Sequence, residues 1–108
     1  MTKDLNSLAR EVHEANRAKG FWDDPRSLCE TTMLIVTELA EAVEEDRAGR
    51  AGVWYADNGK PEGIDIELID ALIRLLDLLG SRGTDVDELL KQKLAYNATR
   101  APKHGKAY

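Results

Sequence analysis

The chain has 108 residues, a net charge of −5 at neutral pH and a single cysteine, Cys29. This length is sufficient for one domain with a modest core, and a content of 43% hydrophobic and 32% charged residues is typical of a globular chain. The negative charge argues against binding to nucleic acid polymers, the apolar runs are too short to cross a membrane, and a lone cysteine excludes an internal disulfide. The charged N-terminus lacks the apolar segment of a signal peptide, so we expect a cytoplasmic protein.

Helical spacing of apolar residues predicts an all-α fold, and no segment has the pattern of a strand. The four helices are expected at residues 5–19, 24–48, 64–79 and 84–98. Ser27 and Glu30 form a capping-box pattern near the start of the second helix. Gly20 and Gly80 are expected to end the first and third helices, and Thr84 to begin the fourth.

The third predicted helix is apolar on nearly every side, so we expect it at the centre of a four-helix bundle and partly covered by a second subunit. Its polar residues, Glu67, Asp70, Arg74 and Asp77, recur at helical spacing and form one stripe. Such a stripe destabilises a buried helix unless it is paired or binds a ligand. A salt-bridge network with Arg74 is the simpler interpretation, and the pattern assigns Asp77 no separate role.

The second and third predicted helices each carry a pair of carboxylates with the same spacing. Glu38 and Glu41 are three residues apart on the second helix, as are Glu67 and Asp70 on the third. If these helices pack antiparallel, the four carboxylates converge and repel one another unless a hard divalent cation, Mg²⁺ or Mn²⁺, binds between them. Such ions can bind a polyphosphate and activate a water. The alternative for Glu38 and Glu41 is an ordinary solvated helix face.

A di-iron carboxylate site is a second metal hypothesis. It needs Glu-x-x-His on two of its helices. The only histidines are His13 and His104, and neither follows a glutamate at that spacing. We therefore set the di-iron hypothesis aside.

The order E-x-x-E then E-x-x-D resembles the signature of the MazG-like family of all-α nucleoside triphosphate pyrophosphohydrolases. The resemblance extends over nearly the whole of residues 1–108 through three further segments, HEANRAKGFWDD, KPEGIDIELIDALIRLLDLLG and KLAYNATRAPKHGK. It implies a single domain that cleaves an NTP or dNTP between the α and β phosphates, giving the monophosphate and pyrophosphate. It also implies that Glu38, Glu41, Glu67 and Asp70 hold Mg²⁺. Either Glu38 or Glu41 would in addition orient the attacking water.

The resemblance also implies residues that contact the base. In related dCTP pyrophosphatases, a first-helix histidine and a tryptophan nine residues later contact the base, and His13 and Trp22 have that spacing here. An indole face stacks on a base, and His13 or Asn16 can hydrogen-bond to its edge. The alternatives are core packing for Trp22 and a partly exposed helix position for His13.

The last group of candidate site residues lies within the basic C-terminal segment of the chain. Lys93 and Asn97 match the K-x-x-x-N pattern of the family, and Arg100 follows at helical spacing. Lysine and arginine suit phosphates, and asparagine suits the sugar or base. The alternative for all three is solubility and charge near a helix C-terminus. Weaker candidates are Tyr96, Lys103, His104 and Lys106.

The resemblance therefore implies a Mg²⁺-dependent nucleotide pyrophosphohydrolase whose partner is a nucleoside triphosphate. The apolar third helix adds the expectation of a homodimer or homotetramer. The alternative is a nucleotide-binding or structural helical module without turnover. Trp54 and Tyr55, in the glycine-rich connection between the two acidic helices, could close over a base or pack against a second subunit. They are not included in the predicted site.

Overall fold

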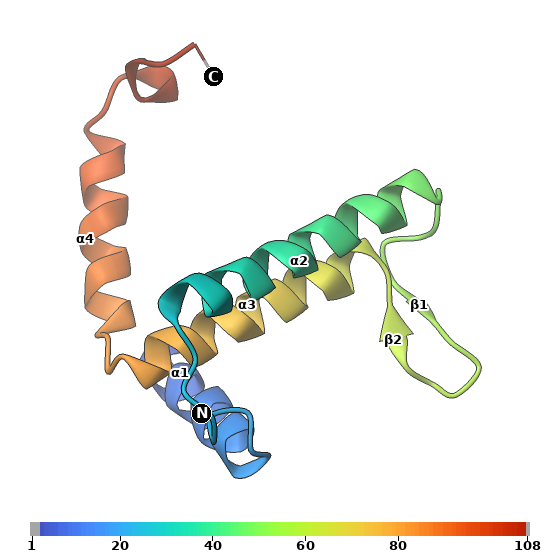
Figure 1. The fold of residues 1–108 in the computed structure, drawn as a ribbon. Helices are drawn as coiled ribbons and strands as arrows, with labels where there is room; N and C mark the ends of the chain where they lie inside the picture. The colour runs from blue at the N-terminus through green and yellow to red at the C-terminus, as the bar shows by residue number, and fades with distance from the viewer. Residues whose placement is uncertain (1–2, 108) are drawn as a thin grey trace.

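A computed structural model describes residues 3–107, without the side chain of His104. Residues 1, 2 and 108 of the predicted domain lie outside the described part (Figure 1). The described chain contains four α-helices, which confirms the all-α class. These are α1 (Leu5–Ala18), α2 (Leu28–Arg47), α3 (Ile64–Ser81) and α4 (Val86–Ala98). Between residues 3 and 107, no helix combines the length and apolar character needed to cross a membrane.

The prediction that the chain has no strand is wrong. Two short strands, β1 (Trp54–Tyr55) and β2 (Pro61–Glu62), pair antiparallel in the connection between α2 and α3. Trp54 anchors this hairpin, because its Nε1 donates a hydrogen bond to Glu45 Oε2 at 3.1 Å. The Arg50 guanidinium lies 5.2 Å from the centre of the same indole ring. The indole of Trp54 therefore holds the hairpin against the end of α2, whereas Tyr55 is exposed.

The helix boundaries follow from side-chain caps. Ser27 accepts a hydrogen bond from the Glu30 backbone N–H at 3.0 Å, which confirms the predicted cap and starts α2 at Leu28 rather than near Asp24. The cap of α4 is Asp85, which accepts from the Glu88 N–H at 3.2 Å, so Thr84 is not the cap. After α4, a short 3₁₀ helix, η1 (Pro102–Gly105), forms in the predicted irregular tail.

Gly80 lies inside α3 and does not end it, contrary to the prediction. A Cβ placed on Gly80 would lie 2.5 Å from the Ala9 carbonyl oxygen and 3.0 Å from His13 Cβ. These distances are too short for a side chain, so the glycine lets α1 cross α3 in close contact. A packing requirement between helices explains this glycine better than a helix stop does.

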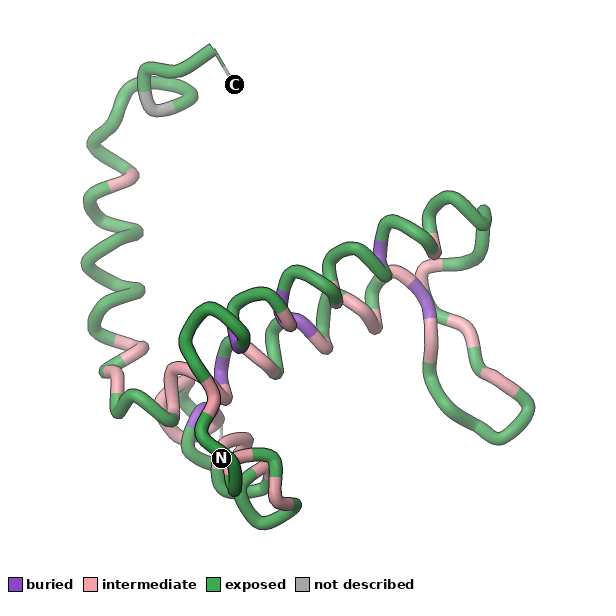
Figure 2. Tube along the Cα trace, in the orientation of Figure 1, coloured by how far each residue is buried: buried purple, intermediate pink, exposed green. Residues whose placement is uncertain are grey.

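The helices α2 and α3 run antiparallel along most of their length, and α1 packs against α3 (Figure 1). The buried positions follow the seam between α2 and α3 and the α1 crossing (Figure 2). The buried apolar side chains are Ala9, Ile35, Ala42, Ala71 and Leu76. Three of these five are alanines, so one chain encloses a small core.

The helix α4 stands apart from the α2–α3 pair, and nearly all of it is exposed (Figures 1 and 2). Its base is fixed to α1 by reciprocal caps. The Asp87 carboxylate accepts hydrogen bonds from the backbone N–H groups of Leu5 and Asn6, each at 3.1 Å, and Asn6 Oδ1 accepts from the Val86 N–H at 2.6 Å. One chain thus packs three of its helices together, and a four-helix bundle stays a prediction for an assembly of chains.

Candidate metal centre and adjoining pocket

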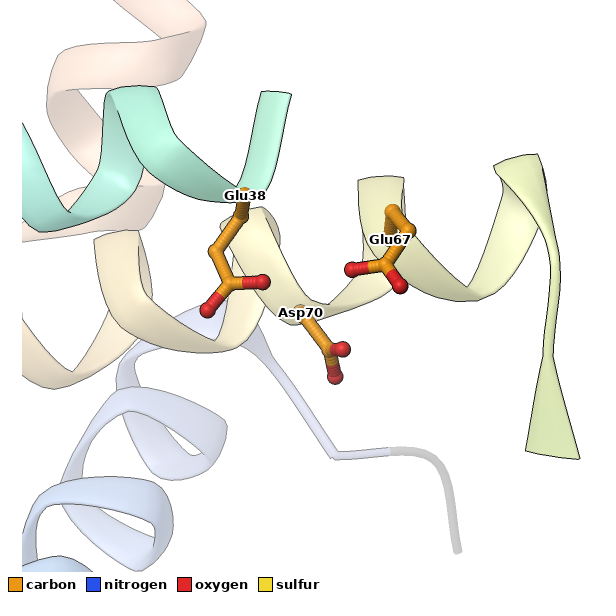
Figure 3. A group of neighbouring side chains, drawn as sticks. All are labelled: Glu38, Glu67 and Asp70. Atoms are coloured by element: carbon orange, nitrogen blue, oxygen red, sulfur yellow. The ribbon is translucent and has the colours of Figure 1, made fainter. Parts of the chain in front are cut away.

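The antiparallel pairing of α2 and α3 brings three of the four predicted metal ligands together. Glu38 extends from α2 towards Glu67 and Asp70 on α3 (Figure 3). One carboxylate oxygen from each lies within 4.8 Å of the others. These spacings suit oxygen atoms around a single hard cation, which is the ligand chemistry that Mg²⁺ and Mn²⁺ prefer.

The fourth predicted ligand, Glu41, lies beside Glu67 rather than inside this group of three. Burial is the main cause that raises the pKa of Glu67 from its ordinary 4.5 to about 7, followed by a hydrogen bond with Glu41 and the charges of Glu41, Asp70 and Glu38. Burial and the Glu38 charge also raise the pKa of Asp70, whereas Lys60 and Arg74 act in the opposite direction. The four carboxylates therefore interact as one acidic cluster.

The carboxylates of this cluster differ in whether they have a partner. Arg74 Nε donates to Glu38 Oε1 at 2.8 Å, so the predicted pairing of Arg74 is present. In contrast, Glu67 Oε2 is buried and has no hydrogen-bond partner among the described residues. A buried carboxylate oxygen without a partner is destabilising, and a bound cation would supply the missing interaction.

A second polar cluster lies two turns further along α3, at Asp77. His13 Nδ1 and Asn16 Nδ2 each lie 2.9 Å from an Asp77 oxygen. Trp22 Nε1 donates to both oxygens, at 3.0 and 3.1 Å. The structure therefore gathers His13, Asn16 and Trp22, which the sequence grouped as base-contacting candidates, around one carboxylate.

A pocket of about 210 Å³ lies between the acidic cluster and the Asp77 cluster. It is lined by Asn16, Phe21, Arg26, Glu38, Asp70, Ile73, Arg74 and Asp77. Sequence analysis missed Phe21, Arg26 and Ile73. One feature of the sequence could have marked Arg26 as a candidate, since no other lysine or arginine lies between Lys19 and Arg47. It is half-buried and makes no hydrogen bond or ion pair with any other described residue.

The remaining candidates, Lys93, Asn97 and Arg100, are not brought to the acidic cluster within one chain. Lys93 and Asn97 are on α4 and Arg100 follows it, on the segment that stands apart (Figure 1). The Lys93 ammonium and the Arg100 guanidinium lie 5.2 and 5.7 Å from the centre of the Tyr96 ring. These residues form a basic and aromatic surface of their own.

No protein family, curated protein or solved structure matches this chain. The geometry of the two clusters and of the pocket between them is therefore the basis for assigning a function.

Proposed function

We propose that this protein is a Mg²⁺-dependent nucleoside triphosphate pyrophosphohydrolase that cleaves between the α and β phosphates. The observation that carries the proposal is the convergence of Glu38, Glu67 and Asp70 oxygens within 4.8 Å, next to a pocket of about 210 Å³. The order of the acidic pairs along the chain, which resembles the MazG-like signature, supports this reaction. The sugar and base are not specified by the acidic cluster.

The residues present fit a hard divalent cation. The donors are carboxylate oxygens, and the buried Glu67 Oε2 lacks a partner among the described residues. Mg²⁺, or Mn²⁺ in its place, would be held by Glu38, Glu67 and Asp70, with Glu41 beside them. When bound, the ion would stabilise negative charge on the phosphates and lower the pKa of a water.

A glutamate of α2 is proposed to orient the attacking water. Glu38 already accepts a hydrogen bond from Arg74 and belongs to the converging group of three. Glu41 lies outside that group, beside Glu67, and its carboxylate can accept a hydrogen bond from a water. We therefore assign the orienting role to Glu41 and the metal-binding role to Glu38.

The pocket also supplies positive charge for a polyphosphate. Arg26 and Arg74 line it together with the carboxylates of Glu38 and Asp70, and Arg74 forms an ion pair with Glu38. Guanidinium groups bind phosphate oxygens through paired hydrogen bonds. Because Arg26 has no partner among the described residues, it is available to a ligand without breaking an existing ion pair.

The assembly is proposed to be a homodimer or homotetramer. On α4, Leu89 and Leu94 are 54% and 58% exposed, and Leu68 and Leu72 on α3 are 47% and 46% exposed. A monomer that left this much apolar surface in water would be unusual, and a second copy of the chain would cover it. In such an assembly, an acidic cluster of the second copy could lie against Lys93 and Asn97 of α4 and Arg100 after it.

The test is a pyrophosphate-release assay across the common NTPs and dNTPs, with Mg²⁺ and then with Mn²⁺. Glu38→Gln and Asp70→Asn should abolish release while the variants keep native helicity. The exposed α2 residue Glu44 provides a matched control, and Glu44→Gln should retain full activity. If the wild-type chain binds Mg²⁺ but releases no pyrophosphate from any nucleotide, the hydrolase proposal fails.

That outcome would favour a nucleotide-binding or structural module without turnover. The ion pair between Arg74 and Glu38 supports this second candidate, because it gives part of the polar stripe a structural role. For a purely structural module, replacing Glu38 and Arg74 together with apolar residues should leave the fold stable or more stable. For the hydrolase, the same replacement should abolish Mg²⁺ binding.

A further inference from the structure

We propose that Lys60, in the loop of the β1–β2 hairpin, binds the terminal phosphate of the nucleotide and makes the site selective for triphosphates over diphosphates. This inference rests on the proposed function and deepens it, because it names a phosphate-binding residue that belongs neither to the acidic cluster nor to the pocket.

The loop that carries Lys60 is closed by hydrogen bonds. The Ala56 N–H donates to the Lys60 carbonyl oxygen at 2.9 Å, and the Gly59 N–H donates to the Ala56 carbonyl oxygen at 2.8 Å. The Lys60 N–H in turn donates to Asn58 Oδ1 at 3.0 Å. These bonds hold the backbone of Lys60 in place, so its side chain extends from a defined position.

The base of the hairpin is joined closely to the start of α3. The Asp65 N–H donates to the Gly52 carbonyl oxygen at 2.9 Å. A Cβ on Gly63, whose φ is +118°, would lie 2.4 Å from that same oxygen, so only glycine permits this approach. Because Glu67 and Asp70 lie near the start of α3, these contacts position the hairpin relative to the acidic cluster.

Lys60 lies close enough to Asp70 for their charges to interact. The hairpin and the Asp70 carboxylate project to the same side of α3 (Figures 1 and 3). Burial is the main cause that raises the pKa of Asp70, and the positive charge of Lys60 opposes this rise. The Lys60 side chain is 67% exposed, and its Nζ lies 3.4 Å from Glu62 Oε1. An ion pair as exposed as this contributes little, so Lys60 can exchange Glu62 for a phosphate.

The other basic residues near the cluster have different positions or partners. Arg74 follows Asp70 by one helical turn and lines the pocket, so along α3 it lies on the opposite side of Asp70 from the hairpin. Arg50 is the only other lysine or arginine in the connection between α2 and α3, and it is paired with Glu45. A phosphate chain that extends from the pocket across the acidic cluster therefore ends at Lys60.

This direction assigns each phosphate a place. The α phosphate lies at the acidic cluster, where the oxygen of the water bonds to the α phosphorus and the water loses its proton to the Glu41 carboxylate. The bond from that phosphorus to the bridging oxygen breaks, and pyrophosphate leaves with the bonding electron pair. Lys60 Nζ donates hydrogen bonds to the γ phosphate. A diphosphate lacks that phosphate and makes no contact with Lys60.

The first experiment compares one nucleoside as its triphosphate and its diphosphate, ATP with ADP and CTP with CDP. Lys60→Gln should lower kcat/KM by at least about tenfold for the triphosphate and by less than about twofold for the diphosphate, because it removes a charged hydrogen bond to the γ phosphate. Lys60→Arg keeps the charge and should retain most of the triphosphate activity. Lys3→Gln, an equal change in charge at an exposed residue before α1, should alter neither substrate.

The second experiment uses Glu62 to separate phosphate binding from a structural role of the same lysine. If Lys60 only holds the hairpin through its ion pair, Glu62→Gln should cause the same loss as Lys60→Gln. If Lys60 binds phosphate, Glu62→Gln releases the ammonium group and should keep or lower KM for the triphosphate. The indole N–H signal of Trp54 in NMR spectra reports whether the hairpin is intact in both variants.

Two results would overturn the proposal. One is a matching loss of activity in Glu62→Gln and Lys60→Gln, and the other is an equal loss for triphosphate and diphosphate in Lys60→Gln. If the wild type turns over no nucleotide, the hydrolase assignment fails separately, and calorimetric titration with inorganic tripolyphosphate and Mg²⁺ then decides the role of Lys60. Affinity that falls at least about tenfold in Lys60→Gln but not in Lys3→Gln supports the phosphate contact, whereas unchanged affinity or no binding by the wild type refutes it.

Discussion

The replacement Glu67→Gln should stabilise the metal-free protein, although it removes a residue of the proposed metal centre. Glutamine keeps the shape of the side chain and removes the charge that burial and the neighbouring carboxylates disfavour. These causes raise the pKa of Glu67 from its ordinary 4.5 to about 7 in the native protein. The native state therefore binds a proton more tightly than the unfolded state does, and the wild type loses stability as pH rises from 4.5 to about 7.

The size of the effect follows from the same pKa values. Since one pKa unit is worth slightly more than about 1 kcal/mol, the rise from 4.5 to about 7 sets an upper limit of about 3 kcal/mol. Glu67 is only half-buried, so solvent screening reduces the expected gain to about 1–2 kcal/mol in the free energy of unfolding. For a chain of this size, each kcal/mol moves the melting temperature by roughly 4–8 °C.

The assay is thermal unfolding followed by circular dichroism, at constant protein concentration, with EDTA or with Mg²⁺. In EDTA, Glu67→Gln should melt above the wild type when the pH exceeds about 7, and the difference should vanish near pH 4.5. Adding Mg²⁺ should raise the melting temperature of the wild type more than that of the variant. The control Glu44→Gln, on the exposed surface of α2, should neither raise the melting temperature in EDTA nor reduce the stabilisation by Mg²⁺. A variant that is less stable than the wild type at every pH in EDTA would refute the reasoning.

Three further predictions test the centre, the packing and the assembly. Asp70→Asn should weaken Mg²⁺ binding by at least about tenfold in calorimetric titration while the helix content is retained; unchanged affinity would exclude Asp70 as a ligand. Gly80→Ala should lower the free energy of unfolding by about 1–3 kcal/mol in urea, because its Cβ would meet the Ala9 carbonyl at 2.5 Å; a neutral effect would mean that α1 can move away. Leu94→Glu should produce a smaller species in light scattering with helicity preserved, whereas a wild type that is already monomeric would contradict the proposed assembly.

The fixed base of α4 bears on how such an assembly forms. Asp87 and Asn6 cap each other's helices, so hydrogen bonds between side-chain oxygens and backbone N–H groups fix the base of α4 to α1. In the proposed assembly, an arm held in this way would present the exposed side chains of Leu89 and Leu94 to a second copy.

Properties that depend on residues close together in the chain were predictable from the sequence. Apolar spacing indicated four helices, and Ser27 with Glu30 indicated the start of α2, because a cap acts over one helical turn. The matching spacing of the two acidic pairs indicated that carboxylates could meet between antiparallel helices. Glu38, Glu67 and Asp70 do meet, since a separation of three residues keeps side chains on one helix face.

Only the tertiary structure decided the features that depend on distant residues. Asp77 had no assigned role in the sequence, yet it binds His13 across 64 positions, and no local pattern marks a bond of that separation. Gly80 was mistaken for a helix stop, because its reason is the α1 backbone that passes over it. The position of α4, apart from the acidic cluster, was likewise undetermined, since helical periodicity defines which face of a helix is apolar but not what covers it.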